Sequence, residues 1–162
     1  MFSPTRSAAL RRVLLAAASI SMLVAAQPAA AAGARPVNFT VHETLPTLGV
    51  GRIVRGQLAD CPNPAVHTTS SGGSGQGGQM VFNGSKRFDC GGGNSLTLAF
   101  RVTTGKCQKT DAGVWKVVRG RGVFASAKGS GRLVGTYMLG NKPGTQCNAD
   151  GLDDHYTGML ER

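Results

Sequence analysis

The chain has 162 residues, and its 18 Lys and Arg outnumber its 8 Asp and Glu, which gives a formal net charge of +10. This length fits one domain with a short additional segment. The 24 glycines exclude a fold of long helices, because a glycine inside a helix costs about 1 kcal/mol relative to alanine.

Residues 1–34 have the pattern of a secretory signal peptide. A positive head (Arg6, Arg11, Arg12) precedes the uncharged run 13–26, which has 14 residues and is too short for a bilayer core that needs about 20. Small residues at 29–34 complete the pattern. We therefore expect no transmembrane span, a secreted or extracytoplasmic protein, and cleavage after one of three alanines, Ala26, Ala32 or Ala34.

Residues 35–162 carry the signal of a single all-β domain. Phe39 and Val41 alternate with polar residues in 38–44, and Leu96, Leu98 and Phe100 do so in 94–103. A period of two is typical of a strand with one buried face. Further strands rich in Val, Phe, Tyr and Thr are predicted, in chain order, at 52–58, 79–89, 114–118, 132–139 and 155–160.

Glycines separate nearly all of these predicted strands. Short strands with turn signals between them favour a small antiparallel β-barrel, closed or nearly closed, of about eight strands. Closure removes the exposed sheet edges that promote aggregation. The low-complexity run 70–78 (SSGGSGQGG) indicates a flexible connection, either a hairpin loop or a mobile lip over the barrel mouth.

The four cysteines all lie in this domain, and an even number in an exported chain indicates disulfides. We prefer Cys61–Cys90 and Cys107–Cys147 among the three possible pairings, because each pair then brackets one half of the domain. A zinc site is disfavoured, since the chain has no C-x-x-C pair and no histidine close to a cysteine in sequence.

Several familiar chemistries have no motif in the sequence. The chain lacks a Walker Gly-Lys-Ser/Thr, a G-x-S-x-G nucleophile elbow and an H-E-x-x-H zinc motif. Its G-x-G fragments are not followed by a helical pattern. We therefore predict no cofactor and no metal.

Basic residues concentrate between Arg101 and Lys142, where Asp111 is the only acid. Such a stretch is either a solvated face that maintains solubility or a site for an anionic polymer. The residues that would contact a polymer are Arg101, Lys116, Arg119, Arg121, Lys128 and Arg132.

The segment 115–137 (WKVVRGRGVFASAKGSGRLVGTY), together with the strand that contains Tyr156-Thr157-Gly158, resembles the barrels of allene oxide cyclases and dirigent proteins. It resembles more closely small exported bacterial proteins that share this pattern. The resemblance covers roughly 96–160 and implies an eight-stranded, calycin-like antiparallel barrel with a central cavity. The motif positions, where Phe124 would plug the barrel end and the glycines would allow the turn, are Gly120, Gly122, Phe124, Ala127 and Gly129.

The expected function is binding of a small apolar or amphipathic ligand, or of an envelope component, inside the barrel. The aromatic residues expected to line the cavity are Phe39, Phe100, Trp115 and Tyr137. The alternative is an enzyme of the cyclase or dirigent type, which would need ionisable groups in the cavity. No catalytic residue carries over from the resemblance, and the weak candidates are His42, Asp154 and His155.

Overall fold

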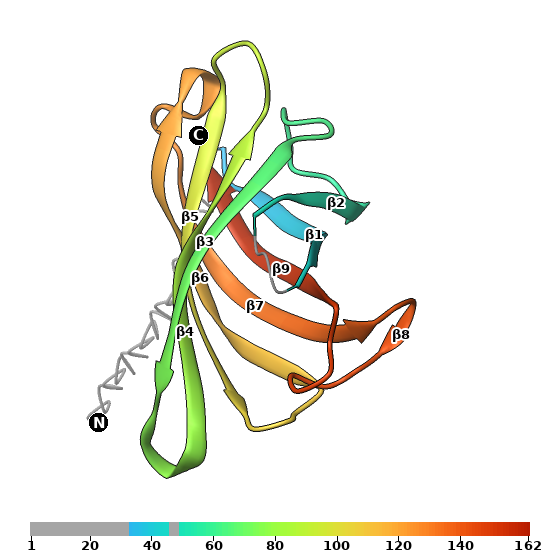
Figure 1. Cartoon of the computed structure of the whole chain (residues 1–162). Coiled ribbons are helices and arrows are strands. Elements are labelled where there is room, and N and C mark those ends of the chain that lie inside the picture. The colour runs from blue at the N-terminus through green and yellow to red at the C-terminus, as the bar shows by residue number, and fades with distance from the viewer. Residues whose placement is uncertain (1–32, 46–48) are drawn as a thin grey trace, which may run out of the picture.

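The computed structural model describes residues 33–45 and 49–162, and their architecture is a closed antiparallel β-barrel (Figure 1). The predicted signal peptide falls on residues outside this range, apart from Gly33 and Ala34. The strands are β1 (Arg35–Thr44), β2 (Gly51–Gly56), β3 (Ala65–Ser74), β4 (Gln79–Asp89), β5 (Ser95–Gly105), β6 (Thr110–Arg121), β7 (Lys128–Leu139), β8 (Lys142–Pro143) and β9 (Gly151–Glu161). Two single-turn 3₁₀ helices, η1 (Gln76–Gly78) and η2 (Gly122–Phe124), complete the elements.

Eight of these strands form the wall of the barrel. Neighbours pair in the order β6-β5-β4-β3-β2-β1-β9-β7, and pairing of β7 with β6 closes the ring. β9 inserts between β1 and β7, so the last strand pairs along its length with the first (Figure 1). β8 forms a short extension of β7. The predicted all-β closed barrel of about eight strands is confirmed.

β3 is a strand that we did not predict from the sequence, because its second half is rich in Ser and Gly. Residues 70–74, which we interpreted as part of a connection, continue β3 and pair with β4 from Ser70↔Gly84 to Ser74↔Met80. The glycine at position 72 fits this strand because a methyl group there would lie 2.7 Å from the Phe82 ring. The absence of a side chain at Gly72 leaves room for an aromatic ring that faces the barrel interior.

Aromatic rings fill the middle of the barrel. Phe39 stacks on Tyr156 with 5.0 Å between ring centroids, and Phe88 meets Phe39 edge-on at 5.5 Å. Trp115 is tilted against Tyr156 at 6.3 Å. Aromatic pairs at such distances add about 0.5–1.5 kcal/mol each beyond their buried area. This layer makes one half of the interior solid.

One disulfide lies near each end of the barrel, in the pairing that we preferred from the sequence. Cys61–Cys90 ties the β2–β3 connection to the end of β4, and Cys107–Cys147 ties the β5–β6 turn to the segment before β9.

The described residues contain no helix long and apolar enough to cross a bilayer.

Removing either disulfide should lower the free energy of unfolding by about 2–5 kcal/mol, because the cross-link restricts the unfolded chain. The paired replacements Cys61→Ser with Cys90→Ser, and Cys107→Ser with Cys147→Ser, test each bridge separately in denaturant unfolding. A midpoint equal to that of the wild type for both pairs would contradict this expectation.

Candidate functional site

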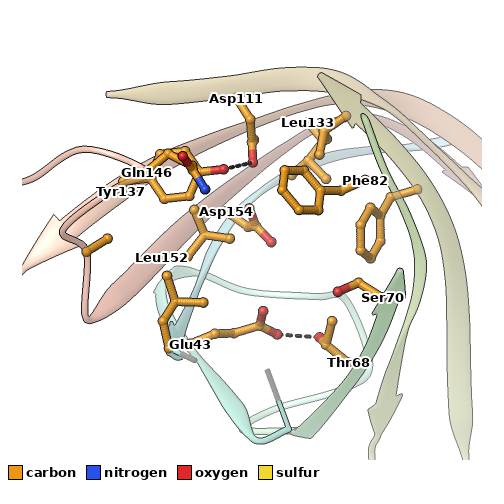
Figure 2. A pocket seen from close by; sticks show the side chains of 14 residues that line it. Glu43, Thr68, Ser70, Phe82, Asp111, Leu133, Tyr137, Gln146, Leu152 and Asp154 are labelled. Carbon is orange, nitrogen blue, oxygen red and sulfur yellow. Dashed lines mark hydrogen bonds between the residues drawn. The ribbon is translucent and has the colours of Figure 1, made fainter. Parts of the chain in front are cut away.

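A cavity of about 270 Å³ occupies the other half of the barrel, on the side of the aromatic layer where β1 ends and β9 begins (Figure 2). Its wall draws side chains from β1, β3–β7 and β9, and its rim from the segment before β9 and from Leu45. The lining combines apolar and polar residues: Glu43, Leu45, Thr68, Ser70, Phe82, Phe100, Val102, Asp111, Leu133, Tyr137, Gln146, Ala149, Leu152 and Asp154.

Strand alternation points the charged residues into this cavity. Glu43 continues the inward series that Phe39 and Val41 begin on β1, and Asp111 shares its face of β6 with Trp115. Because successive side chains of a strand alternate between faces, these carboxylates enter the barrel together with the core residues. Glu43, Asp111 and Asp154 are all at least 95 % buried.

Lys86 is the buried cation that balances part of this negative charge. Its Nζ donates to Asp154 Oδ2 at 2.5 Å and lies 2.9 Å from Glu43 Oε1. The side chain is fully buried and does not line the cavity, whereas both carboxylate partners do. The ammonium group is therefore outside the lining but in contact with two residues that belong to it.

Electrostatics keeps this ammonium group charged. Burial on its own lowers the pKa of Lys86, but its electrostatic interactions with Tyr156, Asp154 and Glu43 outweigh that effect. The net result is a pKa above the ordinary value for lysine. Near neutral pH the negative charge comes from the two carboxylates, because burial raises the pKa of the Tyr156 hydroxyl and keeps it neutral. Burial raises the pKa of Asp154, and the charge of Lys86 opposes this shift. Removing these close partners would leave a buried charge unpaired, which strongly destabilises a folded protein.

Asp111 forms a second polar cluster with β7. Its Oδ1 accepts the Gly135 N–H at 2.9 Å, and its Oδ2 accepts the Tyr137 hydroxyl at 3.3 Å (Figure 2). Burial, followed by repulsion from Asp154, raises the pKa of Asp111 to about 6. Burial and the neighbouring Asp111 also raise the pKa of Tyr137, which therefore stays a neutral hydroxyl donor.

Gly135 allows the two aspartates to converge. A methyl group at this position would collide with Asp111 Oδ1 and would lie 2.9 Å from Asp154 Oδ1. Gly135 pairs with both aspartates in register, with Asp111 on β6 and with Asp154 on β9. The lack of a side chain here brings two carboxylates to the same part of the cavity wall.

Phe82 and Phe100 form an aromatic wall of the cavity, and glycines make room for both rings. A methyl group at Gly84 would lie 2.6 Å from the Phe100 ring, just as one at Gly72 would meet Phe82. Gly72 on β3 and Gly84 on β4 thus make room for the rings that give the cavity its apolar side.

Two of the four aromatic residues predicted to line a cavity do so, namely Phe100 and Tyr137. Phe39 and Trp115 instead pack in the solid aromatic layer. The indole Nε1 of Trp115 donates to the Thr157 carbonyl at 3.1 Å, so its polar atom is satisfied within the wall.

The three weak catalytic candidates do not come together. His42 Nδ1 lies 2.6 Å from Asp153 Oδ1 in a part-buried pair, and His155 Nδ1 lies 3.2 Å from Thr40 Oγ1. Successive side chains of β1 and β9 alternate between the interior and the outside of the barrel. Both histidines occupy the positions between the buried residues, so both lie on the outside. Asp154 alone lines the cavity. Within the described ranges, no three His, Cys, Asp or Glu side chains are arranged so that they could hold a metal ion.

The turn motif lies at the end of the barrel opposite the cavity. Phe124 in η2 is fully buried, and a methyl group at Gly120 would collide with its carbonyl. Gly122 has φ of 60°, a left-handed conformation that glycine adopts without steric cost. Ala127 packs against the core, and Gly129 pairs with Leu160.

The six basic residues predicted for a polymer site are all exposed on β5, β6 and β7. Arg101 and Arg132 flank the exposed Val114 in register, and Lys116 lies two residues further along β6. The remaining members are Arg119, Arg121 and Lys128. Binding of an anionic polymer at this outer face stays a prediction.

Comparisons with protein-family models, curated proteins and solved structures found no match for this chain. The resemblance to allene oxide cyclase and dirigent barrels therefore stays a prediction.

Replacing Lys86 by Met should lower the free energy of unfolding at pH 8 by about 3–5 kcal/mol, because it leaves buried carboxylates without their cation. The deficit should shrink at pH 5. Carboxyl groups whose pKa is higher in the folded than in the unfolded state bind protons more tightly when folded, so acid favours the folded variant. Urea unfolding at both pH values measures this, with Lys116→Met on the outer face as the control. Equal losses for the two variants would contradict the role of Lys86.

Proposed function

We propose that this protein is an exported, disulfide-stabilised barrel that binds a small amphipathic molecule in its cavity. The observation that carries the proposal is a half-filled barrel, with a solid aromatic layer and a cavity of about 270 Å³ above it. Ligand sites typically combine mostly apolar walls with a few placed polar groups. This cavity has that composition, with Phe82, Phe100 and Leu133 on the apolar side.

An exported location is supported by two independent features. Residues 1–34 have the composition of a signal peptide. The two disulfides of the described chain are of a kind that persists in oxidising compartments.

The mouth of the cavity is held by covalent and hydrogen bonds. Cys147 is bonded to Cys107, and the Gln146 N–H donates to the Gln108 carbonyl at 2.8 Å. Gln146 and Ala149 both line the cavity, so this segment sets the shape of the entrance. A pre-formed entrance lowers the ordering cost of binding.

A second candidate function, acid–base catalysis in the cavity, is favoured by Asp111. Its carboxyl group has a raised pKa of about 6 and holds the Tyr137 hydroxyl. General acids and bases work best when their pKa lies near the operating pH. A cyclase- or dirigent-type enzyme would use such a group, and mass spectrometry of a bound molecule before and after incubation distinguishes retention from conversion.

The neutral probe 2-(1-naphthyl)ethanol should bind the wild-type protein at one site in calorimetric titration. Ala149→Trp should weaken binding at least tenfold, because the larger side chain enters the cavity mouth. Ala112→Trp is the matched control, since Ala112 is exposed on β6 and is not part of the cavity lining. Equal affinities in all three proteins would contradict binding in the cavity.

A further inference from the structure

The charged groups that line the cavity are all hydrogen-bond acceptors, beside neutral polar side chains such as Ser70 and Gln146. Three carboxyl groups line it, from Glu43, Asp111 and Asp154, and no Lys or Arg side chain is part of the lining. Lys86, the one buried cation among residues 33–45 and 49–162, places its Nζ against Asp154 Oδ2 and Glu43 Oε1. A ligand therefore meets acceptors where it approaches the charged wall.

Glu43 has one oxygen left over. Its Oε1 accepts the Thr68 hydroxyl (Figure 2) and contacts Lys86. Its Oε2 is buried with no hydrogen-bond partner in the described part of the chain. The residue is 1 % exposed and lines the cavity. A carboxylate oxygen can only accept a hydrogen bond, so the group that satisfies Oε2 has to be a donor. A buried polar atom without a partner destabilises the protein, and binding a donor removes this cost.

The balance of charge in the cavity also favours a positively charged ligand. Three carboxyl groups share one ammonium group, and repulsion from Asp154 contributes to the raised pKa of Asp111. A cation in the cavity would relieve this repulsion, whereas an anion would add to it. Charge-assisted hydrogen bonds to carboxylates are about twice as strong as neutral ones.

The opposite side of the cavity is apolar and of limited size. Phe82 and Phe100 form its aromatic wall, with Leu133 near them (Figure 2). A volume of about 270 Å³ corresponds to about nine waters at ~30 Å³ each. The cavity therefore suits a compact molecule with one aromatic or aliphatic body.

We propose that the cavity selects a small amine, whose ammonium group lies against Glu43, Asp154 and Asp111 and whose apolar body packs on Phe82 and Phe100. This inference rests on the proposed function and narrows it from amphipathic molecules to one charge class. The ammonium group supplies the donor that Glu43 Oε2 lacks and the positive charge that Lys86 alone does not provide.

Three probes of one shape test the charge class: 2-(1-naphthyl)ethylamine, 2-(1-naphthyl)ethanol and 1-naphthylacetate. Calorimetric titration at pH 7.5 should give an amine affinity about ten- to a hundredfold higher than that of the alcohol. The carboxylate should bind more weakly than the alcohol.

Two variants test the residues. Glu43→Gln should reduce the preference for amine over alcohol to about threefold or less, because the amine loses more affinity than the alcohol does. Glu161→Gln, an exposed change on β9, is the matched control and should keep the full preference. Asp111→Asn is a second test that leaves both partners of Lys86 in place.

Acid should weaken amine binding in the wild type. Asp111 faces Asp154 on β9, Tyr137 on β7 and Lys86 on β4, and its carboxyl group takes up a proton near pH 6. Lowering the pH from 7.5 to 5 should therefore reduce amine affinity several-fold and leave alcohol affinity unchanged, and Asp111→Asn should reduce this dependence.

The outcomes separate this inference from the proposed function. Equal affinity for amine and alcohol, or highest affinity for the carboxylate, would overturn the amine preference and leave ligand binding intact. Binding of none of the three probes would overturn ligand binding itself. An amine preference that survives in both Glu43→Gln and Asp111→Asn would show that the charged wall does not cause it.

Discussion

The buried contact of Lys86 with Glu43 and Asp154 is the interaction on which the rest of the barrel interior depends. It joins β4 to β1 and β9, strands that are far apart in sequence, at the level where the aromatic layer ends. Below it the interior is solid, and above it the cavity begins. Without the ammonium group, two carboxylates would be buried with no counter-ion, which is a strongly destabilising arrangement.

In our proposal, the cavity is a compromise between stability and ligand binding. An apolar filling would stabilise the barrel more, since buried ion pairs seldom outperform well-packed hydrophobic residues. The chain instead keeps three carboxyl groups and an unpaired Glu43 oxygen in a space that side chains do not fill. Residues that cost stability and converge in a cavity are typical of functional sites. This is the reason for assigning function to the charged half of the barrel and structure to the aromatic half.

The sequence predicted the fold better than the site, and alternation explains both outcomes. The period of two in 94–103 and 38–44 identified the strands and the closed barrel. The same period would have placed Glu43 inside with Phe39 and Val41, but a charged residue near a strand end is usually solvated. The glycines of β3 made this strand look like a loop in the sequence. Only the structure shows that Gly72 on β3 leaves room for the Phe82 ring and Gly84 on β4 for the Phe100 ring. The pairing of Lys86 with Asp154, 68 residues away, is tertiary and leaves no local signal.

The central claim is that the cavity wall holds buried carboxyl groups whose negative charge exceeds what Lys86 balances, and the pKa of Asp111 responds both to its burial and to the charge of Asp154. Titration of the Asp111 ¹³Cγ resonance by NMR, assigned from the signal lost in Asp111→Asn, measures the pKa in the intact protein. The structure predicts a midpoint near pH 6, because burial and the neighbouring Asp154 disfavour the charged form. A midpoint near 4, the value of a solvated aspartate, would contradict the account.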